Sequence, residues 1–312
     1  MLSLTPPIAP QLARASAEPP EGDGWLYERK WDGFRTIAFV DGAEVYLQSR
    51  NGRPLRRYFP EVEFPRSSRV LDGELVIMRG EHEDFEALQQ RIHPAASRIA
   101  LLAAQLPATF VAFDLLAEGD RSLLDEPFGE RRRMLEQVIA PPLLLAPCTA
   151  DAGAARLWLE TAEGLIAKRI DAAYAPGRRT AMVKVKRIRT IDAVVVGWRP
   201  GKAPGTVGSL ILGLHDGDGE IVVVGHTSGF TARKARDMTG LLAPYETGVH
   251  GTADHSRWSA GRDLEWRALR PELVAEVRFD HTSAGRIRHG AKLVRLRTDK
   301  PPAECMTSQL EG

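Results

Sequence analysis

The chain has 312 residues, a length that suggests roughly two domains of about 150 residues each. Hydrophobic residues make up 43% and charged residues 27% of the sequence, as in ordinary globular proteins. The net charge of +1 argues against a strongly basic nucleic-acid binder. The sequence contains no run of about eighteen apolar residues, so we expect no membrane span.

The N-terminal sequence and the number of cysteines indicate the cellular compartment that we expect. The sequence does not start with a basic region followed by an apolar one, so we expect no signal peptide. Only Cys148 and Cys305 are present, and no C-x-x-C pattern occurs. We therefore expect neither a structural zinc site nor a disulfide framework, and a cytoplasmic setting is favoured.

The first part of the chain leads to a lysine motif. Residues 1–22 are rich in proline and alanine, which predicts an extended leader on the domain surface or partial disorder. Residues 25–28 are predicted to form a short strand that delivers Lys30 into a loop. The segment reads Glu28-Arg29-Lys30-Trp31-Asp32-Gly33-Phe34-Arg35.

This motif has a chemical interpretation and a plainer one. A lysine is a poor nucleophile at neutral pH because its free pKa is about 10.4. Cationic neighbours, such as Arg35 or a bound metal, and partial burial favour the neutral amine, which can attack. Gly33 lets the backbone approach a ligand closely. Alone, such a pattern also fits a surface turn, and other parts of the chain must decide.

Two strands and a turn follow the motif. Residues 34–40 and 43–48 are strand-like and are joined by Asp41-Gly42, a hairpin signal. The next residues, Ser49-Arg50-Asn51-Gly52, form a turn. It is either a plain turn or one that directs Arg50 to a ribose or a phosphate.

Residues 70–78 are an apolar strand interrupted by Asp72 and Glu74. Side chains two residues apart lie on the same face of a strand. Two carboxylates on a buried strand are costly unless they are paired, hydrogen-bonded or bound to metal. The pair therefore indicates a site.

Helices are predicted at 84–92 and 96–104, and a buried strand at 109–116. Phe113 in that strand is either a core residue or a ring that stacks on a flat ligand. Residues 128–139 are predicted to form an amphipathic helix before Pro141-Pro142, and we interpret its three consecutive arginines as a solvated face.

A further helix is predicted at 151–162, followed by a short apolar strand at 163–169 with Glu163 at its start. Residues 181–188 alternate strictly, so Lys184 and Lys186 share one face of a strand. Two such lysines repel each other unless water or an anion lies between them, and a phosphate chain would serve.

After Arg189 the pattern changes. Short strands separated by glycine-rich turns and one helix suggest a small barrel of the oligonucleotide-binding type, with strands at 192–198, 208–214, 220–226 and 272–279 and the helix at 231–242. Six basic residues and no acidic one lie between Arg178 and Arg189. Six more lie between Arg286 and Lys300, with Asp299 as the one acidic residue. Such patches are either solvated faces or phosphate-binding surfaces.

Seven short elements occur once each and in one order: K-x-D-G-x-R, S-R-N-G, D-G-E-L, F-D-L-L, E-G-L-I-A-K-R, K-x-K and R-x-D-K. In this the chain resembles the covalent nucleotidyltransferase superfamily and, within it, ATP-dependent DNA ligases of the bacterial ligase C and ligase D type. The resemblance implies an α+β fold: a nucleotidyltransferase (ATP-grasp-like, adenylation) domain of antiparallel sheets and flanking helices over residues 1–189, and an OB-fold β-barrel over residues 190–312.

The resemblance also implies roles for residues of the first domain. Lys30 looks like the nucleophile that becomes adenylylated by ATP, and the side chain and backbone around Glu28 would contact adenine. The remaining roles concern the sugar, the phosphates and the metal: Arg35 and Arg50 on the ribose and later the nick phosphate, Glu74 on the ribose or a metal-bound water, Phe113 stacked on adenine, Glu163 as a ligand of Mg²⁺ or Mn²⁺, and Lys184 and Lys186 on the α-phosphate.

In the second domain, the tail from Arg295 to Lys300 would cover the pyrophosphate. Lysines, arginines and a divalent metal suit phosphoryl transfer, which needs positioning and neutralisation of spreading negative charge. The implied partners are nicked duplex DNA and repair proteins, with no membrane. The implied state is a monomer in the cytoplasm, associated with the nucleoid.

Two departures from the family pattern concern local packing: Met182 stands where an aromatic residue is frequent, and Gly290 where proline is usual. Two alternatives stay open. An RNA ligase or an mRNA guanylyltransferase of the same superfamily would share the lysine motif. A non-catalytic DNA-binding barrel with a decayed partner domain is disfavoured by the complete set of carboxylates and lysines.

Overall fold

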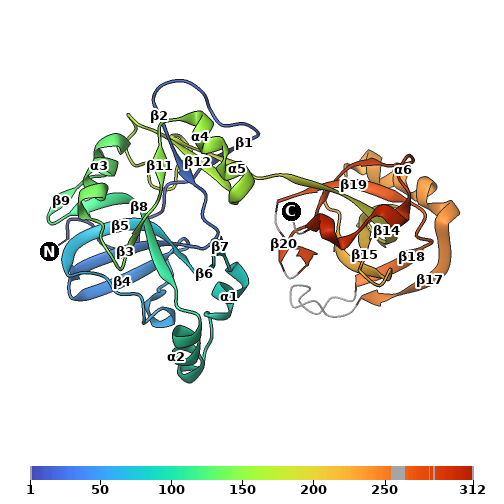
Figure 1. Cartoon of the computed structure of the whole chain (residues 1–312), viewed down its shortest axis with the longest axis horizontal. Coiled ribbons are helices and arrows are strands. Elements are labelled where there is room, and N and C mark those ends of the chain that lie inside the picture. Colours follow the sequence, from blue (N-terminus) through green and yellow to red (C-terminus); the bar gives the residue numbers. More distant parts are fainter. Residues whose placement is uncertain (1, 254–263, 281, 284, 311–312) are drawn as a thin grey trace. The chain divides into compact units, whose positions relative to one another are not determined.

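The computed structural model describes residues 2–253, 264–280, 282–283 and 285–310 (Figure 1). The chain divides into two compact units, Met1–Arg187 and Ile188–Gly312, close to the boundary expected after residue 189. Each unit has its own sheets and its own core, so we describe them separately.

The larger sheet of the first unit carries the D-G-E-L strand at its centre. Its strand order is β10-β8-β5-β3-β4, and β9 pairs with β8. All pairs are antiparallel except that of β10 with β8. The strands are β3 (Phe34–Gly42), β4 (Glu44–Ser49), β5 (Ser67–Val76), β8 (Thr109–Glu118), β9 (Arg121–Ser122) and β10 (Leu144–Leu145).

The second sheet of this unit carries the lysine motif, in the order β1-β13-β12-β2-β11. Its strands are β1 (Arg14–Ser16), β2 (Trp25–Arg29), β11 (Cys148–Thr149), β12 (Gly164–Arg169) and β13 (Met182–Lys186). The leader is extended and largely exposed, as one of our two alternatives expected, and its strand β1 pairs with β13 in parallel. The leader is also anchored by Gln48, whose amide exchanges two hydrogen bonds with the backbone of Ile8.

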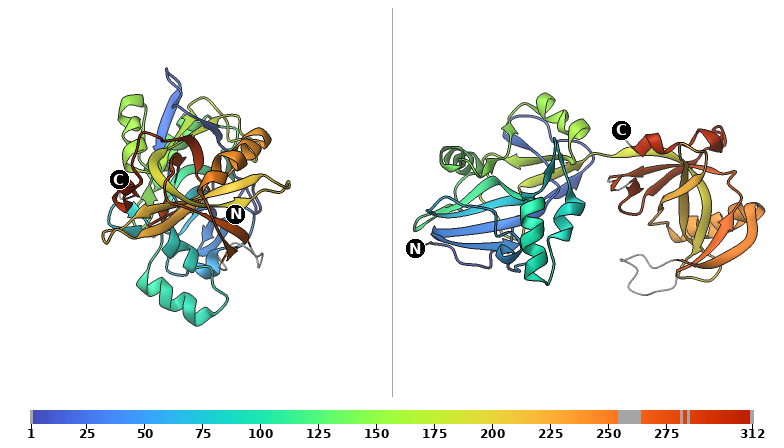
Figure 2. Two further views of the ribbon diagram at one scale, coloured as in Figure 1. Left: turned by 90° about the vertical axis from the view of Figure 1, so that its right-hand side faces the viewer. Right: turned by 60° about the horizontal axis from the view of Figure 1, so that its bottom comes forward.

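Helices cover these sheets. α3 (Phe128–Val138) packs against β8 (Figures 1 and 2). α1 (Phe85–Gln90) starts at Asp84, whose carboxylate accepts a hydrogen bond from the backbone of Ala87. The helix expected over 151–162 is two helices, because the chain turns at Leu157. The other elements are β6 (Met78–Arg79), β7 (His82–Glu83), η1 (Arg56–Tyr58), α2 (Ala96–Gln105), α4 (Ala152–Arg156) and α5 (Trp158–Thr161).

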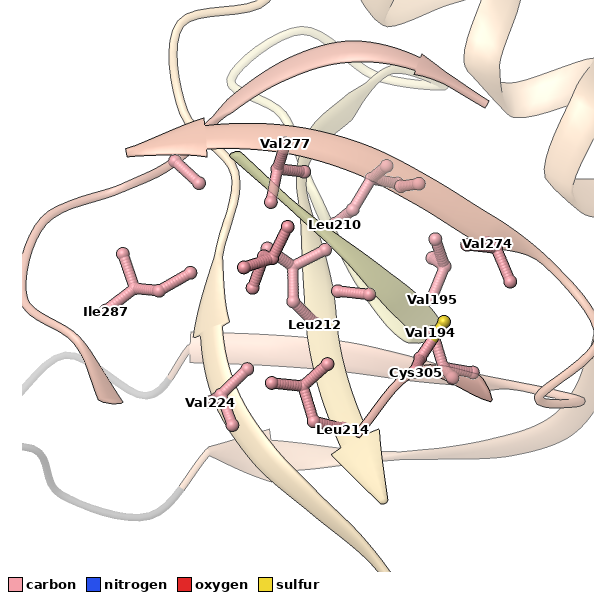
Figure 3. Packing of buried hydrophobic residues seen from close by; sticks show 14 of the residues in the cluster. Val194, Val195, Leu210, Leu212, Leu214, Val224, Val274, Val277, Ile287 and Cys305 are labelled. Atoms are coloured by element: carbon pink, nitrogen blue, oxygen red, sulfur yellow. The ribbon is translucent and has the colours of Figure 1, made fainter. Parts of the chain in front are cut away.

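The second unit is a strongly bent antiparallel sheet around β14 (Arg189–Pro200), which pairs with β15, β18 and β19. Its buried centre comes from valine, leucine and isoleucine side chains of several strands and from Cys305 (Figure 3). The elements are β15 (Val207–His215), β16 (Ile221–His226), α6 (Ala232–Leu242), η2 (Ala243–Tyr245), β17 (Glu246–Ala253), β18 (Leu264–Leu269), β19 (Val274–Phe279), β20 (Thr282–Ser283), β21 (Arg286–Ile287), β22 (Lys292–Leu296), η3 (Pro302–Glu304) and η4 (Thr307–Leu310).

Our sequence analysis predicted no strand at the positions of β17, β18 or β22. Strand β22 carries Lys292 and Arg295 among its five residues and is largely exposed, so its apolar pattern is weak. It is held by antiparallel pairing with β19. The tail motif Arg295–Lys300 therefore begins inside a strand and runs out of it.

Candidate active site

Lys30 lies directly after β2, beside the start of β12. Its backbone N–H donates to the carbonyl of Gly164 at 3.0 Å. Its Nζ lies 3.9 Å from Oε2 of Glu163. The pairing of β2 with β12 thus brings together two residues that the sequence analysis had singled out separately.

Gly33 brings the loop after Lys30 against β5. A Cβ at this position would meet the carbonyl oxygen of Leu75 and would lie 2.8 Å from Cγ of Glu74. No other residue fits without a shift of the backbone, which explains the glycine of the K-x-D-G pattern. The Lys30 loop and the Glu74 side chain are therefore neighbours.

The Glu74 carboxyl has a strongly shifted pKa. Burial raises its pKa to about 8, although Arg35 and Lys30 lower it. The carboxylates of Asp72 and Asp32 add to the rise. A carboxyl in such surroundings binds a cation or a hydroxyl donor readily, because either one compensates for the burial of charge.

Arg35 is held by Asp72 in a two-pronged ion pair. Nε and an Nη atom of Arg35 donate to the two carboxylate oxygens of Asp72, each at 2.6 Å. The hydroxyl of Tyr174 also donates to Asp72 at 2.6 Å. Burial opposes the charge of Arg35, but Asp72 outweighs burial and keeps the pKa of Arg35 above its usual value. The arginine is thus locked in place, and Tyr174 is a member of the site that the sequence analysis missed.

Phe113 is buried, with cations close to its ring. The guanidinium carbon of Arg35 lies 4.4 Å and Nζ of Lys168 lies 4.7 Å from the ring centre. Lys168 also donates to the backbone carbonyl of Phe113 at 3.0 Å. The strand that carries Phe113 is therefore tied to β12 through Lys168.

Glu28 is buried and paired with two cations. Nζ of Lys168 lies 2.8 Å from Oε2 of Glu28, and an Nη atom of Arg132 lies 3.8 Å from Oε1. Our interpretation of the three arginines of α3 as a solvated face is wrong for two of them. Arg131 and Arg132 are buried, and only Arg133 is exposed. Arg131 binds both carboxylate oxygens of Asp114, at 2.8 and 3.0 Å.

The two cysteines are free thiols, as expected. Cys148 lies opposite Glu28 in the sheet, and burial, followed by the charge of Glu28, raises the pKa of its thiol to about 12. Cys305 lies in the core of the second unit, where burial raises the pKa of its thiol to about 11.

The basic residues of the first unit gather as the alternation predicted. Lys184 and Lys186 both lie in β13, two residues apart. Burial lowers the pKa of Lys184, and the charges of Lys186, Arg50 and Lys30 lower it further. These four cations therefore share one electrostatic environment, which favours binding of an anion.

The tail of the second unit is paired with carboxylates of its own unit. Arg295 binds Glu276 at 2.7 Å. Arg297 binds Asp299 through two bonds of 2.8 Å and Asp192 at 3.0 Å. Lys300 lies 3.3 Å from the same Asp192.

Among the described residues no group of three or more histidine, cysteine, aspartate or glutamate side chains could hold a metal ion. Mg²⁺ does not need such a cage, because it commonly binds one or two carboxylates, phosphate oxygens and water. Glu163 and Glu74, both near Lys30, fit that pattern. Among the helices of the described residues, none is long and apolar enough to cross a membrane.

Comparison with known proteins finds matches over both units of the chain. Residues 9–186 match the ATP dependent DNA ligase domain, and residues 203–300 match the ATP dependent DNA ligase C terminal region. The chain is 43% identical to DNA ligase C2 of Mycolicibacterium smegmatis, over 100% of this chain and 96% of that protein. It is 41% identical to DNA ligase C of Mycobacterium tuberculosis, over 99% and 95% of the two chains.

Two solved structures are similar to this chain over most of its length. The ligase domain of LigD from M. tuberculosis is 32% identical, covers 96% of this chain and 98% of its own, and superimposes with a TM-score of 0.53. A mycobacterial DNA ligase D complexed with ATP and MES is 30% identical with a TM-score of 0.52, over 96% of this chain and 98% of that one. The α+β fold with a nucleotidyltransferase unit and an OB-fold barrel is thereby confirmed.

Proposed function

We propose that Lys30 is the residue that carries AMP. The chain belongs to the family of ATP-dependent DNA ligases. The protein is an ATP-dependent DNA ligase. The observation that supports Lys30 is its position in the first unit, 3.9 Å from Glu163, beside Glu74, and in one electrostatic environment with Lys184, Lys186 and Arg50.

The first step would be attack by neutral Nζ of Lys30 on the α-phosphorus of ATP. A P–N bond forms, the bond from the α-phosphorus to the bridging oxygen breaks, pyrophosphate leaves with the electron pair, and the nitrogen releases one proton to water or to the leaving pyrophosphate. Lys184 and Lys186 would neutralise the charge that spreads over the α-phosphate. Arg295 and Lys300 are our candidates for binding the pyrophosphate, because each forms an ion pair with a carboxylate of its own unit, Glu276 and Asp192 respectively, which a phosphate could replace.

Glu163 and Glu74 are the residues that would hold a divalent metal. When bound, Mg²⁺ or Mn²⁺ would supply positive charge to the phosphate oxygens. The chain's own contribution is to place these two carboxylates beside Lys30, through the pairing of β2 with β12 and the close approach at Gly33.

Around the base and sugar, Phe113 would stack on adenine and Glu28 would contact its edge. Both side chains are buried and are linked by Lys168. Arg35 and Arg50 would bind the ribose and later the phosphate of the nick. Arg35 must do so while Asp72 holds it, which fixes its direction.

The later steps would transfer AMP to the 5′-phosphate of a nick and then join the 3′-hydroxyl to that phosphate with release of AMP. The basic residues between Arg178 and Arg189 and between Arg286 and Lys300 would bind the DNA backbone. The monomeric state, the partnership with repair proteins and the cytoplasmic, nucleoid-associated location stay predictions from the resemblance.

The test is sealing of a singly nicked DNA duplex with ATP, compared with nicked duplexes that carry RNA on either side of the nick. We expect joined DNA and a lysyl-AMP adduct mapped to Lys30 by mass spectrometry. An adduct on another lysine contradicts the assignment of the nucleophile, and efficient sealing of RNA alone would restore the RNA ligase alternative.

A further inference from the structure

The carboxylate of Glu28 is a charge buried inside the first unit, with one oxygen more fully engaged than the other. Oε2 lies 2.8 Å from Nζ of Lys168. Oε1 lies 3.8 Å from an Nη atom of Arg132, and among the described residues neither of these two atoms has a hydrogen-bond partner. Oε1 is therefore a buried acceptor with room for one more donor.

The titratable groups around Glu28 come from four elements. Burial raises its pKa, and so does Asp114 on β8, whereas Lys168 on β12 and Arg132 on α3 lower it. Cys148 on β11 faces it as a neutral thiol. The two cations thus decide whether the buried group accepts hydrogen bonds as a carboxylate or donates one as a carboxyl.

Both cations are themselves fixed. Lys168 donates to the carbonyl of Phe113 and lies 4.5 Å from the centre of the Phe128 ring. Arg132 donates to the carbonyl of Ala146 at 2.9 Å and to Glu136 at 2.7 Å. These bonds hold both cations beside the carboxylate of Glu28.

The chemistry of the purine gives this arrangement a consequence. In a nucleotide, the exocyclic 6-amino group is the only N–H donor of adenine. A carboxylate oxygen can therefore bind the edge of adenine only through that group. A site built around a buried acceptor rejects an analogue that lacks the donor, because the acceptor is then left without a partner.

We propose that Lys168 and Arg132 are specificity-determining residues of the nucleotide site: they hold Glu28 as an ionised acceptor, which selects a purine that carries an exocyclic 6-amino group. This inference rests on the proposed function, in which Glu28 contacts adenine. Neither residue touches the nucleotide; both act through Glu28 and are positioning residues.

The experiment compares two substrates in the self-labelling step. ATP is measured against the purine ribonucleoside 5′-triphosphate that lacks the 6-amino group, and the ratio of their labelling efficiencies is determined. The variants are Lys168→Met, Arg132→Met and Glu28→Gln. The matched control is Arg133→Met, on the same helix, whose guanidinium is exposed and pairs with Glu130 at 2.9 Å.

For the wild-type protein we expect a preference for ATP of about 100-fold, since a buried acceptor left without a donor costs about 1–3 kcal/mol. In Lys168→Met and Arg132→Met the carboxyl becomes protonated and donates to N1 of either purine, so the ratio falls about tenfold or more. The loss lies mainly in the KM for ATP. Arg132→Lys, which keeps a cation, restores part of the ratio, and Arg133→Met leaves it unchanged.

The pH profile separates this role from a structural one. In the wild-type protein the ratio falls as pH falls and Glu28 takes up a proton. In Arg132→Met that fall starts at higher pH, and in Glu28→Gln it is absent. If Lys168→Met does not fold, Arg132→Met and the wild-type pH profile decide. A wild-type ratio retained in a folded Arg132→Met at every pH overturns the inference, whereas absence of any labelling of the wild-type protein overturns the proposed function instead.

Discussion

The two units of this ligase hold their functional charges in different ways. In the first unit Asp72 is fully buried and receives Arg35 and Tyr174, and Glu28 is enclosed with Lys168. In the second unit Arg295 pairs with Glu276 while 58% of its side chain is exposed, and the carboxylate of Asp299 is 60% exposed. The carboxylates of Asp72 and Glu28 are thus built into the core, whereas the side chains of Arg295 and Asp299 lie on the surface.

The difference indicates what each set can do. A buried ion pair cannot exchange partners easily, because a charge left alone in the interior is costly. An exposed pair contributes little and can be replaced by another anion. The first unit is therefore suited to holding a small nucleotide in one geometry, and the tail of the second unit is suited to leaving its carboxylates for phosphates.

The largest expected effect comes from replacing the proposed nucleophile of the first unit. Lys30→Ala should abolish labelling by ATP, because no other group replaces the attacking amine. Lys30→Arg should do the same, because the guanidinium stays protonated. Labelling is measured with radioactive ATP and gel analysis, and wild-type levels of adduct in either variant would show that another residue carries AMP.

A pair of isosteric changes compares the two units directly. Asp72→Asn leaves Arg35 without its buried partner, and we expect a loss of about 3 kcal/mol in the free energy of unfolding. Asp299→Asn removes an exposed partner of Arg297 and should leave the unfolding midpoint unchanged. Denaturant titration measures both, and equal losses in the two variants would remove the distinction between the units.

Replacing Glu163 tests its proposed role as a metal-binding residue of the first unit. Glu163→Ala should slow labelling about thirtyfold at saturating ATP, because charge neutralisation at the phosphates becomes weaker. Excess Mg²⁺ or Mn²⁺ should recover part of the rate. The control is Glu160→Ala, on α5. An unchanged rate at every metal concentration would exclude the role.

The affinity of the second unit's basic residues for DNA should depend on salt concentration. Replacing both Arg286 and Arg288 by alanine should weaken binding to nicked DNA about tenfold at low salt. It should also reduce the slope of log affinity against log salt by roughly 2, since each phosphate contact contributes about 0.9. Fluorescence anisotropy over a salt series measures this, with Arg233→Ala as the control. A slope equal to that of the wild-type protein would exclude these arginines from DNA binding.

Glu74 gives the smallest predicted effect. Its pKa is raised to about 8 in the folded state, so its contribution to stability is fully present below its ordinary pKa of 4.5 and is lost as pH rises through about 8. Because the side chain is partly exposed, we expect a change of about 1 kcal/mol over this range. Glu74→Gln should remove that part of the pH dependence in denaturant titrations, and identical pH curves would contradict the shifted pKa.

Much of the first unit could be predicted from pattern alone. The alternation around Lys184 and Lys186 and the acidic pair on an apolar strand both pointed to residues that the fold brings near Lys30. The arginines of α3 were misjudged because charge was read before periodicity. Phe128, Arg131, Arg132 and Leu135 recur at helical spacing, and these are the buried residues of that helix.

Other features had no local signal. Tyr174 lies in a segment of alanine and proline, and its link to Asp72 joins residues 102 positions apart in the chain. Lys168 did carry a signal, because a lysine at the end of an apolar strand must find partners. Which partners it finds depends on the packing of β2, β8 and α3, which no single segment encodes.

Each unit contains one cysteine, whose chemical modification can report the unfolding of that unit. Cys148 belongs to the first unit and Cys305 to the second, and the sequence has no others. Because the thiolate is the reactive form, pKa values of about 12 and about 11 keep both sulfurs nearly inert near neutral pH while the fold is intact. A thiol reagent added during a denaturant titration should therefore modify each cysteine much faster once its own unit has unfolded. Peptide mapping of the two sites would then report the order in which the halves of the molecule come apart.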